Sequence, residues 1–417
     1  MKKVLATILA LVMALGVTTA AAWADGTGET CNGENCTHAA AIGNTHYNTL
    51  ADAITAAADG DTIKLLANVE ASNYTEIRKA LTIDFNGCTM TSTDGGFDVY
   101  SNLTLKNGTL NTLKWGAWVQ SGAKLVVAED MTINTTSTDG NKGGITVQNS
   151  GSEVTVYGKV MAAGGAAISG IGNASDGGVI INIEEGAEVT CTNPDGLGVY
   201  YPNTAKLNIK GGTITGASGV YVKSGAVSIT GGKIVATGAK VDYQYYGNGG
   251  HSTGEALVID KCNYPGGNPT VSITGGTFTS TNAKAVGSYV GNGAAEPVTA
   301  FVSGGTFSTD VKEYLAEGKI LQKNGDTYTA VTNSGITSGT YTAKPTVPDG
   351  YKVVENTDGT FTVEKVGGYY YYQPTTDTKA DGTKGSPKTF DAGVGIYAVT
   401  AVLSVTGMAW TAKKRGN

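Results

Sequence analysis

One phrase of alternating apolar and polar residues recurs along the middle of the chain. Clear copies are LNIKGGTITG at 207–216, VSITGGKIVATG at 227–238 and VSITGGTFTSTN at 271–282. In the last copy, Val271 and Ile273 point to one side of an extended strand, whereas Ser272 and Thr274 point to the other. A Gly-containing turn follows, and then a second short alternating run. The pattern predicts pairs of short β-strands joined by tight turns.

The turn glycines recur at the spacing of a solenoid. They are Gly87, Gly108, Gly158, Gly186, Gly212, Gly232, Gly276 and Gly305. Successive members are 21, 50, 28, 26, 20, 44 and 29 residues apart, and the intervals of 50 and 44 fit two units each. Coils stacked about 4.8 Å apart would bury one continuous apolar core. A β-sandwich is the alternative, because strands separated by turn signals about every 8–12 residues also suit that fold.

The segment before the repeat, THYNTLADAITAAADGDTIKLL, predicts a helix and then a first strand. Thr49 and Asp52 have the spacing of a capping box at the start of a helix. The apolar face would consist of Leu50, Ala53, Ile54 and Ala57. Gly60 would end the helix. A helix at 49–59 would cover the open end of the solenoid core, which otherwise exposes apolar side chains and strand edges.

Residues 311–366 contain two similar alternating patterns after the last copy of the repeat. Each pattern has a central turn, Asn324-Gly325-Asp326 in the first and Asp358-Gly359-Thr360 in the second. Runs that alternate Thr and aromatic residues follow both turns. The pattern predicts two small β-hairpin units that cap the solenoid or form a short stalk.

The N-terminus has the three parts of a secretory signal. Lys2 and Lys3 are followed by an apolar run to about Val17 and by Ala22-Trp23-Ala24. The apolar run is shorter than the roughly 20 residues that a membrane-spanning helix needs. We expect a signal peptide at 1–24 that is removed before Asp25, so that 25–48 forms the N-terminal segment of the mature chain.

The C-terminus predicts a membrane-spanning helix. Residues 392–412 are uncharged, 21 residues long and rich in Val, Ala, Leu and Ile. That length suits a hydrocarbon core of about 30 Å. Basic residues follow in the tail at 413–417, which we expect to be cytoplasmic, and everything before the helix should lie outside the cell. The polar stretch at 367–391 has no apolar period and predicts an extended spacer.

A five-residue motif stands just before the apolar segment: Ser386-Pro387-Lys388-Thr389-Phe390. The order of motif, apolar span and basic tail resembles the cell-wall sorting signal of Gram-positive surface proteins, whose pentapeptide is of the LPxTG type. Pro387 and Thr389 match that type, whereas Ser386 replaces Leu and Phe390 replaces Gly. The resemblance implies a sortase that cleaves after Thr389 and joins the chain to the wall. Because of Phe390, simple retention in the membrane is the alternative.

The repeat over roughly residues 40–330 resembles the right-handed parallel β-helix, or pectin-lyase-like, superfamily. More narrowly, it is similar to repeat-rich surface proteins of gut Gram-positive bacteria. The resemblance implies an all-β fold, a right-handed parallel β-helix solenoid at 49–310. The short N-terminal capping helix, the small hairpin units and the C-terminal transmembrane helix complete the expected architecture. The localisation expected from both ends is the cell surface, with the ectodomain extracellular and anchored to membrane or wall.

Charge excludes some classes of partner. Apart from Lys2, Lys3, Lys413, Lys414 and Arg415, the chain has 24 Lys and Arg residues against 35 Asp and Glu, all of the latter between Asp25 and Asp391. The exported part is therefore about −11. Nucleic acids and anionic membrane surfaces need basic patches, so neither is an expected ligand.

The five cysteines are too few for a disulfide scaffold. Cys31 and Cys36, in CNGENC, are close enough to form a disulfide in an oxidising exterior. His38 and His46 follow, but the spacing favours a disulfide or free thiols over a zinc site. The other three, Cys88, Cys191 and Cys262, are expected to pack as small apolar residues.

Catalysis has to be judged from residues, because the fold family includes pectate lyases and polygalacturonases. In that family, lyases use Ca²⁺ on acidic clusters with an Arg or Lys base, and hydrolases use grouped aspartates. Here the arginines are Arg78 and Arg415, no two aspartates are adjacent, and His251 stands alone in a loop. No catalytic, cofactor-binding or metal-binding residue is identified. A polysaccharide lyase or hydrolase remains one alternative.

Binding is the favoured function. An insertion at 239–269 interrupts the repeat, and insertions of solenoids often form a binding face. Tyrosines stack on sugar rings and hydrogen-bond their hydroxyls. The candidate glycan contacts in the insertion are Tyr243, Tyr245, Tyr246, His251 and Tyr264. Trp115 and Trp118 form a second candidate site. The sequence thus favours a non-catalytic surface protein that binds a polysaccharide or a host surface, with a passive structural role as a further alternative.

Overall fold

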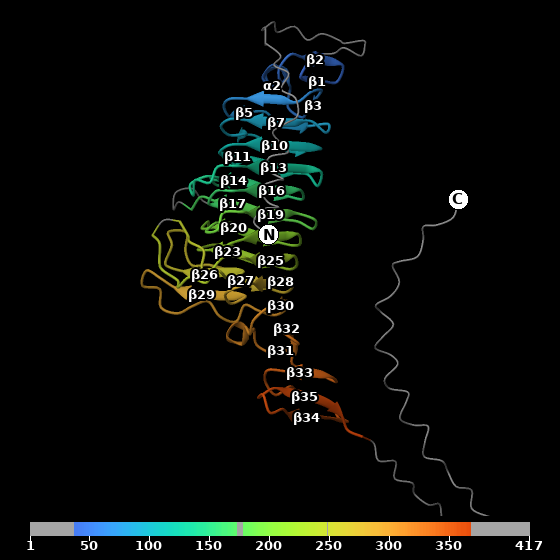
Figure 1. Ribbon diagram of the computed structural model, residues 1–417, viewed down its shortest axis with the longest axis vertical. Coiled ribbons are helices and arrows are strands. Elements are labelled where there is room, and N and C mark those ends of the chain that lie inside the picture. The colour runs from blue at the N-terminus through green and yellow to red at the C-terminus, as the bar shows by residue number, and fades with distance from the viewer. Residues whose placement is uncertain (1–36, 173–177, 248, 368–417) are drawn as a thin grey trace, which may run out of the picture. The chain divides into compact units, whose positions relative to one another are not determined.

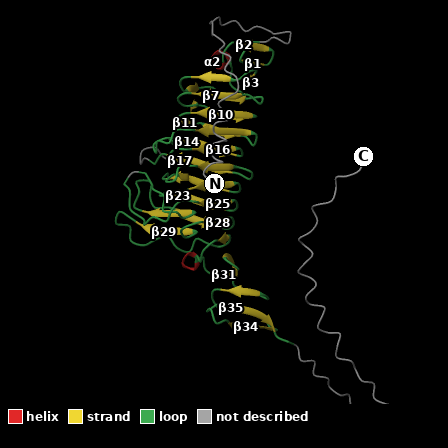
Figure 2. Cartoon of the chain, in the orientation of Figure 1, coloured by secondary structure: helices red, strands yellow, loops and turns green. Residues whose placement is uncertain are grey.

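The computed structural model describes residues 37–172, 178–247 and 249–367. This part of the chain is nearly all β, and most of its strands belong to three long sheets, here called A, B and C. Each successive coil adds one strand to each sheet, as Figures 1 and 2 show. The arrangement is consistent with a parallel β-helix solenoid, and the prediction of an all-β chain with long parallel sheets is confirmed. The β-sandwich alternative is wrong, because neighbouring coils pair in parallel.

Sheet A contains eleven strands. In spatial order they are β2 (Thr45–Tyr47), β1 (Ala40–Ile42), β3 (Thr62–Leu65), β6 (Leu81–Asp84), β9 (Leu103–Lys106), β12 (Lys124–Val127), β15 (Glu153–Val156), β18 (Ile180–Ile183), β21 (Lys206–Ile209), β24 (Ala226–Ile229) and β27 (Thr270–Ile273). The first three pair in antiparallel fashion, and all later pairs are parallel.

Sheet B contains fifteen strands. The parallel part consists of β4 (Val69–Ala71), β7 (Thr89–Ser92), β10 (Gly108–Thr112), β13 (Met131–Thr135), β16 (Lys159–Ala162), β19 (Glu188–Cys191), β22 (Thr213–Gly216), β25 (Lys233–Ala236), β28 (Thr277–Ser280) and β30 (Thr306–Phe307). An antiparallel part continues through β32 (Thr327–Thr332), β31 (Lys319–Asn324), β33 (Gly339–Tyr341), β35 (Phe361–Lys365) and β34 (Tyr351–Glu355).

Sheet C contains nine parallel strands. They are β5 (Thr75–Ile77), β8 (Phe97–Val99), β11 (Trp115–Val119), β14 (Gly143–Val147), β17 (Ala166–Gly170), β20 (Leu197–Tyr201), β23 (Ser218–Val222), β26 (Leu257–Lys261) and β29 (Val286–Val290). Several of these strands are one residue longer than the sheet A strands of the same coils. Their outward side chains contribute to the candidate site described below.

The core is a column of stacked aliphatic side chains. In sheet A, residues that pair in register from one coil to the next are buried together: Ile83, Leu105, Val127, Val156, Ile183, Ile209, Ile229 and Ile273. Each such side chain stabilises the fold by about 1.5–3 kcal/mol through its burial. The alternation of the repeated phrase therefore fixes which face of every strand enters the core.

Turn glycines serve two different purposes. Gly232 has a φ of 82°, in the left-handed region that favours glycine. At Gly108 the left-handed residue is its neighbour Asn107, with a φ of 58°. A Cβ on Gly108 would lie 2.3 Å from Cβ of Phe85, so this glycine is required for close packing between coils.

One of the two long intervals between turn glycines was misjudged from sequence. The interval of 50 residues contains an additional coil, which begins with β12. The interval of 44 residues contains only one coil, because β24 pairs directly with β27. The additional length lies between β25 and β26, where the chain lacks the alternating pattern and forms a long loop. The insertion is thus a lateral extension of one coil.

The described residues contain a single α-helix, α2 (Leu50–Ala56), within the range expected from sequence. Its N-cap is Thr49, whose Oγ1 accepts a hydrogen bond from the backbone N–H of Asp52 at 3.1 Å. The prediction that Gly60 ends the helix is wrong, because the C-cap is Ala57, where the backbone becomes extended with φ −60° and ψ 147°. A lysine that follows β5 contacts carbonyls at this end. Nζ of Lys79 donates to the carbonyl oxygens of Thr55 and Ala57 at 2.7 and 2.6 Å. Leu50 and Ala53 of the helix are buried.

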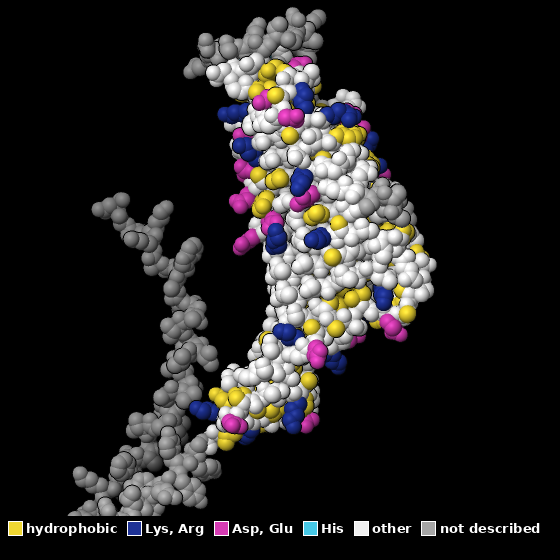
Figure 3. Space-filling view, turned by 180° about the vertical axis from the view of Figure 1, so that it is seen from behind, with side chains coloured by type: hydrophobic (Ala, Val, Ile, Leu, Met, Phe, Trp, Pro, Cys, Tyr) yellow, Lys and Arg dark blue, Asp and Glu magenta, His cyan; other side chains and the backbone are white. Residues whose placement is uncertain are grey.

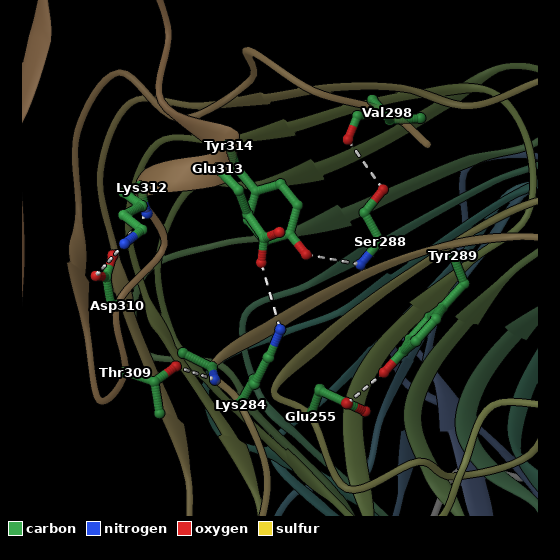
Figure 4. Close-up of polar contacts among 11 residues, drawn as sticks. Glu255, Lys284, Ser288, Tyr289, Val298, Thr309, Asp310, Lys312, Glu313 and Tyr314 are labelled. Atoms are coloured by element: carbon green, nitrogen blue, oxygen red, sulfur yellow. Dashed lines mark hydrogen bonds and ion pairs between the residues drawn. The ribbon is translucent and has the colours of Figure 1, made fainter. Parts of the chain in front are cut away.

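The far end of the solenoid is held by the segment after β29, drawn in Figure 4. The backbone N–H of Ser288 donates to the hydroxyl of Tyr314 at 3.3 Å, and Oγ of Ser288 donates to the carbonyl of Val298 at 2.9 Å. Tyr314 belongs to a 3₁₀ turn, η1 (Lys312–Tyr314), and its ring stacks on Phe301 at a centroid distance of 5.1 Å. These contacts bring aromatic side chains over the end of the core.

Within residues 311–366 the structure forms two antiparallel hairpins, β31–β32 and β34–β35. The turn between β31 and β32 contains Gly325, and the turn between β34 and β35 contains Gly359. Strand β32 pairs with β30 of the solenoid, so the hairpins extend sheet B. A small separate apolar cluster, which includes Ile336 and Val363, stabilises this extension.

Charged side chains on the solenoid surface form ion pairs between neighbouring coils. Lys124 Nζ lies 3.1 Å from Glu153 Oε2, and Lys159 Nζ lies 2.9 Å from Glu188 Oε1. On the face shown in Figure 3, Lys and Arg side chains are interspersed with Asp and Glu. Such exposed pairs contribute little to stability, about 0–1 kcal/mol each, but they leave mixed charge on this face.

Several predictions from sequence fall outside the described residues. These are the signal peptide, the disulfide between Cys31 and Cys36, the spacer, the sorting-like motif at 386–390 and the helix at 392–412. Within the described residues, no helix has the length and apolar character needed to cross a membrane. Among the remaining cysteines, Cys191 and Cys262 are buried and Cys88 is half-buried, and all three carry free thiols.

Candidate functional site

The outer face of sheet C presents one column of side chains, with one residue from each coil. Neighbours in the column pair in register along the sheet. From the N-terminal end they are Asp98, Trp118, Thr146, Ser169, Tyr200 and Tyr221. From Trp118 onward, each is the fourth residue of a five-residue strand, in the sequences WGAWV, GGITV, AAISG, LGVYY and SGVYV. Because side chains alternate along a strand, the fourth position faces outward at every coil.

A groove with a volume of about 560 Å³ lies over this column. Trp118, Thr146, Ser169 and Tyr200 contribute to its lining from the sheet. The loop before β14 adds Lys142, the loop after β19 adds Asp195, and the insertion adds His251 and Tyr264. The insertion therefore forms one wall of the groove, and the strands of sheet C form its floor.

Aromatic rings are prominent in the groove. Trp115 and Trp118 meet edge to face with ring centroids 5.1 Å apart, and Tyr200 lies 6.0 Å from Tyr221. Nζ of Lys142 lies 4.0 Å from the centroid of the Trp115 ring, a cation–π contact. Rings of this kind offer flat apolar faces beside polar groups, which suits ligands with both apolar and hydroxyl-bearing surfaces.

A second, smaller hollow of about 290 Å³ adjoins the first and shares Trp115 and Trp118 with it. Its other lining residues are Tyr74, Asp98, Gln120 and Gln148. The Gln120 side-chain amide donates to the Asp98 carboxylate, and Nε2 of Gln148 lies 3.5 Å from Oε1 of Gln120. Together the two hollows give sheet C a continuous surface that runs along several coils.

Several buried polar atoms of the lining residues have no hydrogen-bond partner among the described residues. They are Nε1 of Trp118, Oη of Tyr200, both ring nitrogens of His251 and, in the smaller hollow, Oη of Tyr74. Buried polar atoms in native proteins nearly always have a partner. Burial raises the pKa of both tyrosines, Tyr74 and Tyr200, so their hydroxyls remain protonated donors at neutral pH. The cluster therefore has unused capacity for hydrogen bonds in the place where the rings gather.

The wall formed by the insertion rests on a buried lysine. The Lys223 side chain is fully buried, and its Nζ donates to the carbonyls of Tyr246 and Gly249 at 2.6 and 2.9 Å. The same Nζ lies 3.7 Å from Oδ2 of Asp260, which is also fully buried. Asp260 in turn accepts a hydrogen bond from the Tyr221 hydroxyl at 2.8 Å. This network holds the chain at Tyr246 and Gly249, just before and at the start of the lining residues 249–251.

The five candidate side chains of the insertion fall into three groups. His251 and Tyr264 line the groove, and the Tyr264 hydroxyl donates to the carbonyl of Gly172 at 3.1 Å. Tyr243 is used within the protein, since its hydroxyl donates to Asp260 at 2.6 Å. Its ring also stacks on that of Tyr289 at 4.5 Å. Tyr245 and Tyr246 are 40% and 46% exposed outside the lining. Contact of these five residues with a glycan stays a prediction.

The two sites predicted separately from sequence meet in one groove, because Trp115 and Trp118 line it together with His251 and Tyr264. Sequence reasoning missed Thr146, Ser169, Tyr200 and the buried Lys223. These strand residues could have been found from the fourth position of each five-residue strand of sheet C, where the side chain points outward. That position carries different residue types from coil to coil, so no repeated letter marks it.

The described residues contain no group of three or more His, Cys, Asp or Glu side chains placed to hold a metal ion. The rings of His38 and His46 lie 5.7 Å apart, near the N-terminal end of sheet A. Comparison of the chain with protein-family models, with curated proteins and with solved structures found no match in any of the three.

Proposed function

We propose that this chain is a non-catalytic glycan-binding protein of the bacterial cell surface, with its ligand in the groove over sheet C. The observation that carries the proposal is the coincidence of aromatic faces and unpartnered polar atoms around one hollow. Sugars present apolar C–H faces to rings and hydroxyls to donors and acceptors. Trp118 and Tyr200 each supply both kinds of contact.

The proposal includes the finer architecture expected from the resemblance, namely a right-handed, pectin-lyase-like solenoid anchored by a transmembrane helix at 392–412. The basic and apolar start of the chain and the motif at 386–390 support export followed by anchoring at the envelope. N-terminal sequencing of the protein from cells should give Asp25 as the first residue. An intact N-terminus that begins at Met1 would contradict export by a cleaved signal.

Binding is tested by a glycan array and by calorimetry with the purified chain. Trp118→Ala removes a ring and a donor from the groove floor and should weaken binding about ten-fold or more. Tyr157→Ala is the matched control, because Tyr157 is 36% exposed and does not line the groove. Equal affinity in Trp118→Ala and the wild type, or no glycan bound at all, would refute the proposed site.

The proposal that the protein is not an enzyme is tested separately. The chain is incubated with the bound polysaccharide, with and without Ca²⁺, and the mixture is assayed for new reducing ends and for unsaturated products. Unchanged polysaccharide is the expected result. Product formation that disappears in a groove variant would make the protein a lyase or hydrolase instead.

A further inference from the structure

Few charged side chains line the groove over sheet C and the smaller hollow beside it. The two hollows are lined by one lysine, Lys142, and by two aspartates, Asp98 and Asp195. Asp195 is exposed at the rim, and Asp98 accepts hydrogen bonds from Gln120 and from the Tyr100 hydroxyl. No described Lys or Arg side chain forms an ion pair with either aspartate.

Four cations close to the groove strands already have partners. Lys142 Nζ lies over the Trp115 ring and 4.0 Å from Oδ2 of Asp139. Lys114, next to β11, pairs with Asp94 at 2.8 Å. The remaining two are Arg78, which pairs with Glu76, and Lys223, which is buried against Asp260. An anionic sugar would therefore have to displace an existing contact before it gained one of these four cations.

We infer that the groove takes a neutral glycan and discriminates against uronates and sulfated sugars. This inference rests on the proposed function and specifies its ligand. A carboxylate on the ligand would enter a surface whose two hollows together are lined by two aspartates and one lysine. Like charges that are brought together at a partly desolvated site oppose binding. Beside the His251 imidazole, the groups that remain for recognition are neutral: indole and phenol rings, Thr146 and Ser169 hydroxyls, and the Gln120 and Gln148 amides.

The reach of the column agrees with an oligosaccharide as the ligand. From Asp98 on β8 to Tyr200 on β20 the column crosses four steps between coils. At about 4.8 Å per step these positions span about 19 Å. Neutral hydroxyl, amide and ring groups are presented along most of that distance. The acidic polysaccharides suggested by the pectin-lyase-like resemblance are therefore disfavoured here.

The experiment compares matched neutral and anionic probes with the full chain. Binding of mannohexaose, cellohexaose, xylohexaose and β-1,4-galactohexaose is measured by calorimetry beside that of hexagalacturonate. At least one neutral hexaose should bind ten-fold or more tightly than hexagalacturonate. Tightest binding of hexagalacturonate, weakened by salt, would overturn this inference while leaving glycan binding intact. Binding of none of the probes, together with an empty glycan array, would instead refute the proposed function.

A charge-reversal variant tests the reason for the selectivity. Asp195→Lys places a cation at the rim and should raise the affinity for hexagalacturonate, relative to that for the neutral hexaose, three-fold or more. Glu129→Lys makes the same change of charge in the exposed turn between sheets A and B, and should leave both affinities as they are. Equal effects of the two variants would show that net charge alone, rather than the groove, decides the preference.

Discussion

Replacing Lys223 with methionine should remove the support of the groove wall and destabilise the solenoid. The side chain is fully buried, and methionine has a similar apolar stem but no charge and no donor. The substitution leaves the Asp260 carboxylate buried without its cation, and leaves the carbonyls of Tyr246 and Gly249 without this partner. The perturbation is thus local in space but affects both the core network and the insertion.

The expected magnitude follows from the geometry. Breaking a buried ion pair by removing one partner costs about 3–5 kcal/mol. Asp260 keeps the hydroxyl donors of Tyr221 and Tyr243, at 2.8 and 2.6 Å, so the loss should fall near the lower end, about 3 kcal/mol. Lys210→Met is the matched control, because Lys210 pairs with Glu184 at 2.7 Å on the surface. That exposed pair should be worth about 0–1 kcal/mol.

Guanidinium unfolding followed by circular dichroism gives the free energy of unfolding of each variant. Adding Asp260→Asn to Lys223→Met should recover about 1–2 kcal/mol, because the unpaired carboxylate is then gone. Limited chymotrypsin digestion reports on the wall, since cleavage at Tyr245 and Tyr246 should accelerate in Lys223→Met. A loss of stability no larger than that of Lys210→Met, with unchanged digestion, would refute the reasoning.

Two further predictions concern packing and pH. Gly144→Ala should lower the free energy of unfolding by about 1–3 kcal/mol, because the new Cβ would lie 2.4 Å from the carbonyl oxygen of Ala167. Gly140→Ala is the control and should be nearly neutral, because its Cβ would have no atom within 4 Å. Similar losses of stability in both variants would contradict the packing argument. Burial raises the pKa of Tyr201 and, with the added effect of Asp260, that of Tyr221. The stability from these two tyrosines is complete below the unfolded pKa of about 10 and is lost above it, by about 1.4 kcal/mol per pH unit for each group. These two groups alone should lower the free energy of unfolding by about 2–3 kcal/mol between about pH 8 and about pH 11, and other tyrosines with a raised pKa, such as Tyr74 and Tyr200, should add to the fall. Phenolate absorbance of Tyr201 and Tyr221 should appear only on unfolding. Equal stability at both pH values would contradict the prediction.

The repeat was predictable because one side-chain period decides both burial and pairing. The alternation in VSITGG indicates which face of each strand is buried, and the glycine intervals indicate where most coils turn. The start of α2 was also readable, since Thr49 and Asp52 are three residues apart and lie in local contact. The number of coils in the interval of 44 residues could not be predicted, because a long insertion and an additional coil can add the same length to a sequence.

The candidate site was predictable only in part, because it depends on contacts between coils. Trp115, Trp118 and His251 stood out as isolated aromatic or titratable residues, but nothing local places the insertion beside β11. Thr146 and Ser169 are ordinary strand residues until the parallel register aligns them with Trp118. From sequence alone, Lys223 would be predicted to lie on the surface. Its burial depends on the alignment of β23 with β26, which lie far apart in the sequence.

Hydrogen exchange with and without ligand shows directly whether the groove over sheet C is the binding surface. The chain is saturated with the tightest-binding neutral hexaose, and backbone exchange is followed by mass spectrometry. Binding in the groove should slow exchange in β11, in the loop before β14 and at 249–251, and should leave exchange in the strands of sheet A unchanged. Protection confined to sheet A, sheet B or the hairpins after β30 would contradict it.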